Sequence, residues 1–191
     1  MSDAMTDAEL VNLLQARLCE DFAGDAARRV LADDAVGVLY RVSTSPHDGL
    51  PKAVRHQLLF RAAYVLERVY FDAPEQFRPL ADDFCRRAFP ECRDASARRC
   101  FGKIMADLLD HFTPELPVLD RIAECAADWA TDPGSKVAVR VWAVEILKRC
   151  REHVAWVSEV WDDVVEAQTR VATPGIASRL RTSWRDGSTS L

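Results

Sequence analysis

The chain has 191 residues, of which 49% are apolar and 29% charged, the composition of a soluble globular protein that is long enough to bury a core. Its 25 Lys and Arg residues against 30 Asp and Glu give a net charge of −5, without the basic excess of a domain that grips nucleic acid through phosphate contacts. Only 7 glycines are present, which leaves little material for a phosphate-cradling loop, and the abundance of alanine, leucine and arginine favours helix.

The N-terminal region carries the acidic excess, because residues 1–48 hold 9 acidic and 4 basic side chains whereas residues 49–191 hold 21 of each. Leucines at helical spacing predict an amphipathic helix over residues 6–21, followed by a short helix from about Asp25 and a second from about Asp33. We find neither a secretory signal pattern nor a run of apolar residues long enough to cross a membrane, and expect a cytoplasmic protein.

Long helices are predicted after the break at residues 43–51, where serine, proline and glycine cluster. They are expected at residues 52–72, 74–88, 94–112, 117–130, 135–152, from a turn near His153 to about 171, and from about 176. The breaks before the long helices fall near residues 51, 93, 133 and 174, about 40 residues apart. This spacing predicts a series of repeated helical hairpins.

A shift of 80 residues superposes the segment 62–84 on the segment 142–164 without a gap. Most aligned positions match in residue class, including the turn and the paired aspartates, and Arg99 falls on Arg179. Glu145 falls on Val65, so its carboxylate is not expected to be a feature of the repeat.

In the segments RAAYVLERV (61–69), SARRCFGKIM (96–105) and KVAVRVWAVEIL (136–147), the chain resembles the HEAT/armadillo-like proteins, in particular short uncharacterised bacterial members. The resemblance implies an all-α, right-handed α-α superhelix of three to four helical hairpins with an N-terminal helical cap. The implied parts are the cap at 1–48, a repeat region 49–186 with hairpins at about 51–92, 93–132, 133–173 and 174–186, and a frayed tail at 187–191. Such packing motifs specify an architecture and not an activity.

Motifs that carry chemistry are missing from the sequence: there is no HExxH, CxxC, GxSxG, P-loop or GxGxxG pattern. We therefore assign no catalytic residue, metal site or cofactor. Six cysteines lie in helical patterns and are expected to be reduced, mostly buried thiols: Cys19, Cys85, Cys92, Cys100, Cys125 and Cys150. The aspartate pairs at 33–34, 82–83 and 162–163 are expected on solvated faces, and the basic run over 86–103 is expected to form ion pairs, notably with the Asp82–Asp83 region.

The stretch VRVWAVEILKRC (139–150) gathers a tryptophan, an acid and a thiol, but its spacing predicts packing. Trp142 and Cys150 fall on the core face, as do Trp129 and Trp161 in their own helices, and Glu145 is expected as a semi-exposed partner of Arg149 at i,i+4. Trp156 falls off its helix's core face, so it is either an exposed binding anchor or a hydrophobic staple at the turn, and the staple is favoured.

The function expected from these features is that of a non-enzymatic scaffold or adaptor. Stacked hairpins present a concave surface lined by their second helices, and its mixed charge suits a protein or peptide partner better than a polyanion. The residues expected there are Arg78, Asp82, Arg86, Arg121, Glu124, Asp128, Asp162 and Glu166, with Trp156 beside them.

Two other functions and the oligomeric state stay open. Some HEAT-like proteins are DNA glycosylases that hold alkylated duplex DNA in a basic groove with tryptophans and an aspartate, residue types present here at 128–129 and 161–163. A hydrolase or lyase with an unrecognised constellation of residues is the third option.

Overall fold

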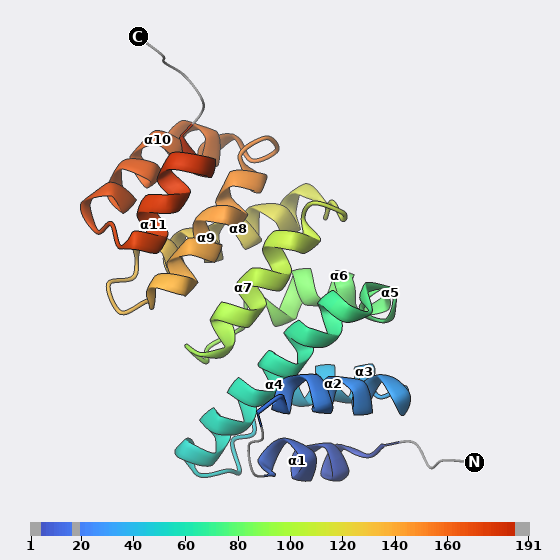
Figure 1. Ribbon diagram of the computed structural model, residues 1–191. Helices are drawn as coiled ribbons and strands as arrows, with labels where there is room; N and C mark the ends of the chain where they lie inside the picture. Colours follow the sequence, from blue (N-terminus) through green and yellow to red (C-terminus); the bar gives the residue numbers. More distant parts are fainter. Residues whose placement is uncertain (1–4, 17–19, 186–191) are drawn as a thin grey trace. The chain divides into compact units, whose positions relative to one another are not determined.

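The computed structural model describes residues 5–16 and 20–185, and in these ranges every regular element is a helix and none is a strand (Figure 1). The all-α expectation is therefore confirmed. The chain divides into two units, Met1–Ile104 and Met105–Leu191, and the division falls inside a helix. The tail predicted at 187–191 lies outside the described residues.

Three short helices open the first unit: α1 (Asp7–Gln15), α2 (Phe22–Ala32) and α3 (Val36–Thr44). The Thr6 hydroxyl accepts a hydrogen bond from the Glu9 backbone, and the Glu9 carboxylate accepts one from the Thr6 backbone at 2.7 Å, which is a capping box that fixes the start of α1. The helix predicted over 6–21 ends earlier, at Gln15, and α2 begins three residues before its predicted start.

Helix α4 (Lys52–Asp72) begins and ends where the sequence predicts and packs against α2 and α3 (Figure 1). It follows the predicted break, within which His47 has a positive φ of 51°. Arg61 is only 7% exposed, and its guanidinium donates to the carbonyl oxygens of Leu14 at 2.7 Å and Ala16 at 2.9 Å. This cation thereby satisfies carbonyls at the end of α1 and ties α1 to α4.

The predicted helix over 74–88 is instead a broken series: α5 (Pro74–Phe77), a 3₁₀ turn at Arg78–Leu80, α6 (Ala81–Asp83) and a π turn at Phe84–Ala88. Pro79 explains the break, because it has no N–H to donate within a continuous helix. The rings of this segment pack edge to face with their neighbours, with centroids 5.1–5.4 Å apart, and these contacts join Tyr70, Phe77, Phe84 and Phe101.

The remaining helices run close to their predicted ranges. They are α7 (Ala97–Leu108), which crosses the division between the units, α8 (Leu116–Thr131), α9 (Val137–Cys150), α10 (Ala155–Arg170) and α11 (Pro174–Arg179), which continues as a π turn at Leu180–Trp184. Helix α9 packs against α8, α10 and α11, and is the centre of the second unit (Figure 1). Three tryptophans lie in this core: Trp129, Trp161 and Trp184.

Helices α8 and α10 lie side by side and run in the same direction. Near their N-terminal ends, the Trp156 indole N–H donates to the Asp120 carboxylate at 2.7 Å. Near their C-terminal ends, the Gln168 amide contacts the Ala130 carbonyl at 3.4 Å. Since the order of contacts is the same along both helices, the pair is parallel.

Candidate functional site

A buried carboxylate joins α4 to α7 in the first unit. Glu67 is 6% exposed and accepts hydrogen bonds from Lys103 Nζ at 2.8 Å and Arg99 Nη2 at 3.1 Å. Removing a carboxylate from water is costly unless cations replace the hydration, and here two cations do so. We call this arrangement the Glu67 node.

Three aromatic rings on the same face of α4 form what we call the aromatic strip: Phe60, Tyr64 and Phe71, which are 39%, 41% and 40% exposed. The rings of Phe60 and Tyr64 stack with an interplanar angle of 8°. The Arg99 guanidinium lies 5.6 Å from the Tyr64 ring centroid, and Lys103 Nζ lies 4.4 Å from that of Phe71. The strip is therefore an exposed apolar surface edged by the two cations of the Glu67 node.

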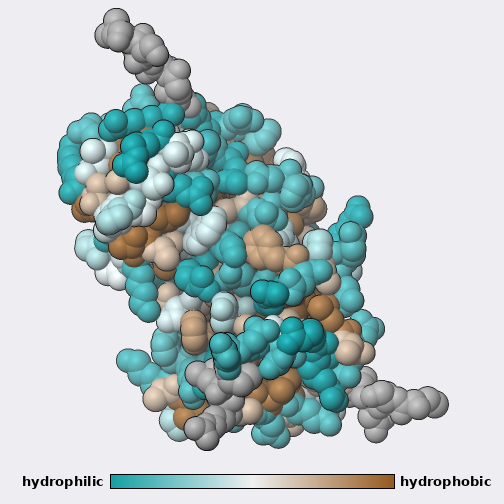
Figure 2. Space-filling model, in the orientation of Figure 1, coloured by the Kyte–Doolittle hydropathy of each residue, from teal (hydrophilic) through white to brown (hydrophobic). Residues whose placement is uncertain are grey.

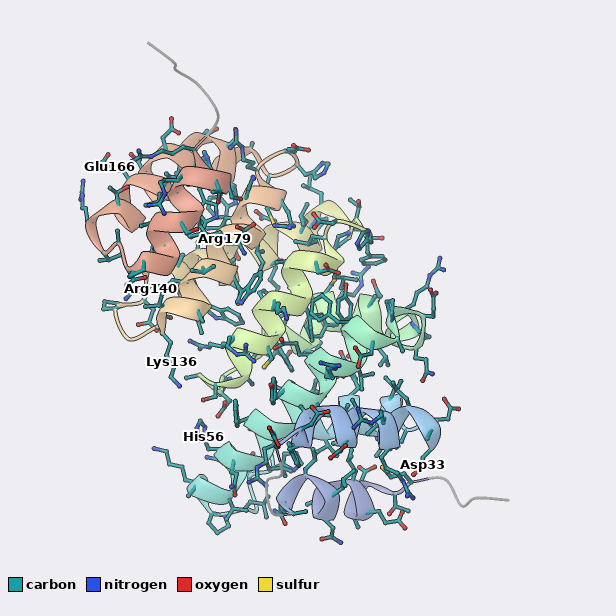
Figure 3. All side chains as sticks on the ribbon, viewed as in Figure 1. Asp33, His56, Lys136, Arg140, Glu166 and Arg179 are labelled. Atoms are coloured by element: carbon teal, nitrogen blue, oxygen red, sulfur yellow. The ribbon has the colours of Figure 1, made fainter. Side chains whose placement is uncertain are left out.

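A histidine, a carboxylate and a serine meet at the start of α7. His56 Nδ1, on α4, is 2.6 Å from Asp94 Oδ2, and His56 Nε2 is 3.5 Å from Ser96 Oγ. Figure 3 labels His56 in the lower part of α4. No local sequence pattern marks this group, because 38 and 40 residues separate His56 from its partners.

A second buried carboxylate lies in α9. Glu145 is 4% exposed, and contrary to the expectation of a semi-exposed pair it binds four groups. Its i,i+4 contact with Arg149 is confirmed at 3.0 Å, and Arg179 (Figure 3) approaches to 3.1 Å. Ser183 and the buried Trp184 indole donate to Glu145 Oε1 at 3.3 and 2.9 Å. We call this the Glu145 node.

Trp142 is half-buried, so its prediction as a core residue is wrong. The Arg179 guanidinium lies 5.7 Å from its ring centroid, which keeps one face of the indole under a cation. Cys150, by contrast, is fully buried as predicted.

The two nodes share one geometry. In each, an aromatic residue precedes the buried glutamate by three positions, and an arginine from a later helix contacts both the ring and the carboxylate. Arg99 and Arg179 serve as the cations, at the positions that the shift of 80 residues aligns. The two glutamates themselves are 78 residues apart, so the shift of 80 residues does not align them and Glu145 still falls on Val65.

Three of the nine residues expected at a partner surface, Arg78, Asp82 and Arg86, lie in the first unit and are exposed. Arg86 Nε contacts both oxygens of Asp82 at 2.9 Å. One residue further along the same segment, Arg87 pairs with Asp83 at 2.8 Å. The ion pairing expected of the basic run is confirmed at these sites and at the Glu67 node.

Asp83 also ties this segment to α3, because the Tyr40 hydroxyl donates to it at 2.6 Å. The hydrogen bond from Arg87 holds the pKa of Asp83 below its ordinary value. Burial, and then the hydrogen bond to Asp83, raise the pKa of Tyr40. The second aspartate of this pair is thus half-buried and structural, and not part of a fully solvated face.

The six other expected residues lie in the second unit on α8 and α10. Five of them are exposed: Arg121, Glu124, Asp128, Asp162 and Glu166. Glu166 is labelled at the outer edge of this unit in Figure 3, and hydrophilic side chains dominate the visible surface in Figure 2. Trp156 is half-buried and hydrogen-bonded to Asp120, so it does not stand free as an anchor. Since α8 and α10 are parallel neighbours, we call their exposed residues the α8–α10 face.

Cys85, Cys100 and Cys150 are free thiols, and all three are buried. Burial raises the pKa of each of these three thiols to about 12, which keeps them protonated and unreactive. Cys19 lies outside the described residues. Within 5–16 and 20–185, no group of three or more His, Cys, Asp or Glu side chains is arranged to hold a metal ion.

These features define an all-helical protein in which two buried glutamates, each bound by two cations, join α4 to α7 and α9 to α11. Of the helices described, none is long and apolar enough to cross a bilayer. No protein-family model, no curated protein and no solved structure matches the chain.

Proposed function

We propose that the chain is a short helical-repeat protein of the HEAT/armadillo kind, a right-handed superhelix of stacked hairpins that serves as a scaffold for a protein or peptide partner. The observation that carries this proposal is the regular sequence separation of its helix-to-helix contacts. In a solenoid each repeat contacts its neighbours, so long-range contacts recur at about one repeat length.

The contacts follow that rule in both units. Glu67 contacts residues 32 and 36 positions later, and His56 contacts Asp94 at 38. In the second unit, Asp110 contacts Arg149 at 39 and Glu145 contacts Trp184 at 39. The two contacts between α8 and α10 span 36 and 38 residues. In these contacts α4 meets α7, the turn after α7 meets α9, α9 meets the π turn that follows α11, and α8 meets α10, and this order supports stacked hairpins.

The surface we assign to the partner is the α8–α10 face, where two second helices lie in register. Its exposed charged side chains are mainly acidic, with Arg121 and Arg170 among Glu124, Asp128, Glu159, Asp162, Asp163 and Glu166. A basic segment of a protein complements such a face, and charge complementarity speeds association and selects partners. We therefore assign a Lys- or Arg-rich peptide segment as the partner's contact.

Binding of the intact protein to an array of short peptides that vary in charge tests this assignment. We expect Lys- and Arg-rich peptides to be retained, and the double variant Asp128→Lys, Glu166→Lys to bind them about tenfold more weakly or worse. The matched control, Glu20→Lys with Glu75→Lys, makes the same charge change on exposed residues of the first unit. Equal loss in both double variants, or no peptide retained, would sink the proposal.

Nucleic-acid binding is the second candidate, and the aromatic strip favours it. Residues 49–104 hold 11 basic and 7 acidic side chains, and single-stranded nucleic acids bind where exposed rings lie beside cations. Labelled single-stranded and duplex DNA at two salt concentrations test this candidate with the Tyr64→Ala variant. Absence of binding at low salt removes it.

A further inference from the structure

We propose that Ser96, His56 and Asp94 form a nucleophile, base and carboxylate relay at which Ser96 accepts the acyl group of an aryl ester. The activity goes beyond the scaffold function and does not rest on it. The three side chains come from two elements of the first unit, α4 and the turn that precedes α7.

The contacts of His56 set the direction of proton transfer. With Asp94 Oδ2 only 2.6 Å from Nδ1, the ring donates its Nδ1–H to the carboxylate, which leaves the lone pair of Nε2 facing Ser96. The Ser96 Oγ to Nε2 distance of 3.5 Å is long for a hydrogen bond, as contacts between nucleophile and base often are before substrate binds. The order of roles is that of serine hydrolases: hydroxyl, imidazole, carboxylate.

Asp94 is held rigidly in its orienting position. Its side chain is 13% exposed, and its Oδ1 accepts the backbone N–H groups of Ser96 and Ala97, both at 2.9 Å. The same carboxylate therefore fixes the turn that carries the nucleophile and the ring that serves as the base. A relay needs this kind of support, because a displaced base loses its reach to the hydroxyl.

The surroundings indicate the class of substrate. The aromatic strip begins one helical turn after His56, with Phe60 and then Tyr64 on the same face of α4, and it can receive the apolar or aryl part of an ester. Arg99 lies one turn after Ser96 on α7, and its side chain is 36% exposed.

Few groups near Ser96 can stabilise the negative charge that forms on the carbonyl oxygen during the reaction. The backbone amides of Ser96 and Ala97 are bound to Asp94 and cannot serve as an oxyanion hole. The next groups along α7 are engaged as well, because Arg98 N donates to the Asp94 carbonyl at 3.0 Å and Arg99 Nη2 is bound to Glu67 at 3.1 Å. We expect slow turnover, restricted to esters whose leaving group is a stabilised phenolate.

The reaction runs in two balanced steps. Ser96 Oγ forms a bond to the carbonyl carbon while its proton passes to His56 Nε2, and the bond between that carbon and the phenol oxygen breaks, with the proton returned to the departing phenolate. Water then attacks the acyl carbon and loses a proton to His56 Nε2. The bond between that carbon and Ser96 Oγ breaks, and His56 returns the proton to Ser96 Oγ, which regenerates the hydroxyl.

The test uses the intact protein, an aryl fluorophosphonate as probe and p-nitrophenyl butyrate as substrate. We expect the probe to lose fluoride and to label Ser96, as located by mass spectrometry of peptides. In Ser96→Ala the labelling should vanish, and in His56→Gln it should slow by about 100-fold or more, the usual contribution of a general base.

The Asp94→Asn variant distinguishes loss of the proton relay from loss of the folded structure. An asparagine oxygen still accepts the two backbone N–H groups, but its amide now donates toward His56 and reverses the tautomer, so labelling should again slow by about 100-fold or more. The matched control is Ser135→Ala: Ser135 also precedes a long helix and lies 3.4 Å from an aspartate, Asp132, but contacts no histidine in the described part of the chain. Thermal melts show whether each variant is folded.

Four results would overturn the proposal: no labelling of the folded protein, labelling of hydroxyls other than Ser96, an equal rate in folded His56→Gln, or hydrolysis of the ester unchanged in Ser96→Ala.

Discussion

Replacing Glu145 by alanine tests the role of the buried node in α9. The carboxylate is 4% exposed and serves as acceptor for Arg149, Arg179, Ser183 and Trp184. Its removal leaves the fully buried Trp184 indole N–H without its acceptor, at a cost of about 1–3 kcal/mol. It also leaves the partly buried Arg179 guanidinium without this counter-charge, while Arg149 keeps its pair with Asp110 at 2.8 Å. Breaking a buried ion pair by removing one partner costs about 3–5 kcal/mol.

We therefore expect Glu145→Ala to lower the free energy of unfolding of the second unit by about 3–5 kcal/mol. Glu145→Gln keeps an acceptor for Trp184 and loses only the charge, so its loss should be smaller. Urea unfolding followed by tryptophan fluorescence reads this unit selectively, because all five tryptophans lie after residue 128.

The control for this measurement is Glu166→Ala on α10. Glu166 pairs with Arg170 at i,i+4 on the surface, where such pairs contribute less than about 1 kcal/mol. If Glu145→Ala loses no more stability than Glu166→Ala, the buried node does not stabilise the unit and the reasoning fails.

Three further predictions concern single groups. Trp142→Ala should cost roughly 2 kcal/mol in the same urea assay, about half of what a fully buried aromatic costs, and a loss above 3 would place the ring in the core. Cys85, Cys100 and Cys150 should resist iodoacetamide at pH 8 in the native protein and react in urea, because a pKa near 12 keeps each thiol protonated at that pH. Because the pKa of Asp83 is lowered in the folded state, its ionised carboxylate stabilises the fold at neutral pH, and this contribution is lost as the pH falls through that pKa. The Asp83→Asn variant should therefore lose less stability than the wild type on acidification. Equal losses in the two proteins would contradict this prediction.

Helix α4 could be predicted residue for residue because its signals are local. A cluster of turn formers precedes Lys52, and the helical spacing of apolar residues continues unbroken to Asp72. The segment from Pro74 to Ala88 kept the same spacing, yet Pro79 interrupts it, which a count of periodicity does not register.

The candidate sites depended on partners far away in sequence. Only the i,i+4 contact of Glu145 with Arg149 could be predicted from local spacing. Arg179 and Trp184, which help to bury the carboxylate, lie 34 and 39 residues later in the sequence. His56 likewise has no partner within its own helix. The spacing of about 40 residues between the breaks in the sequence was the signal that could have related such positions to one another.

The parallel stacking of α8 on α10 is the most direct test of the helical-repeat proposal. In nuclear Overhauser spectra of the intact protein, we expect contacts between Asp120 and the Trp156 indole, and between Ala130 and Gln168. Both sets together establish that second helices of successive hairpins lie side by side and point the same way. Contacts that join Asp120 to Gln168 instead, or none between the two helices, would contradict the stacked-hairpin architecture and the partner surface built on it.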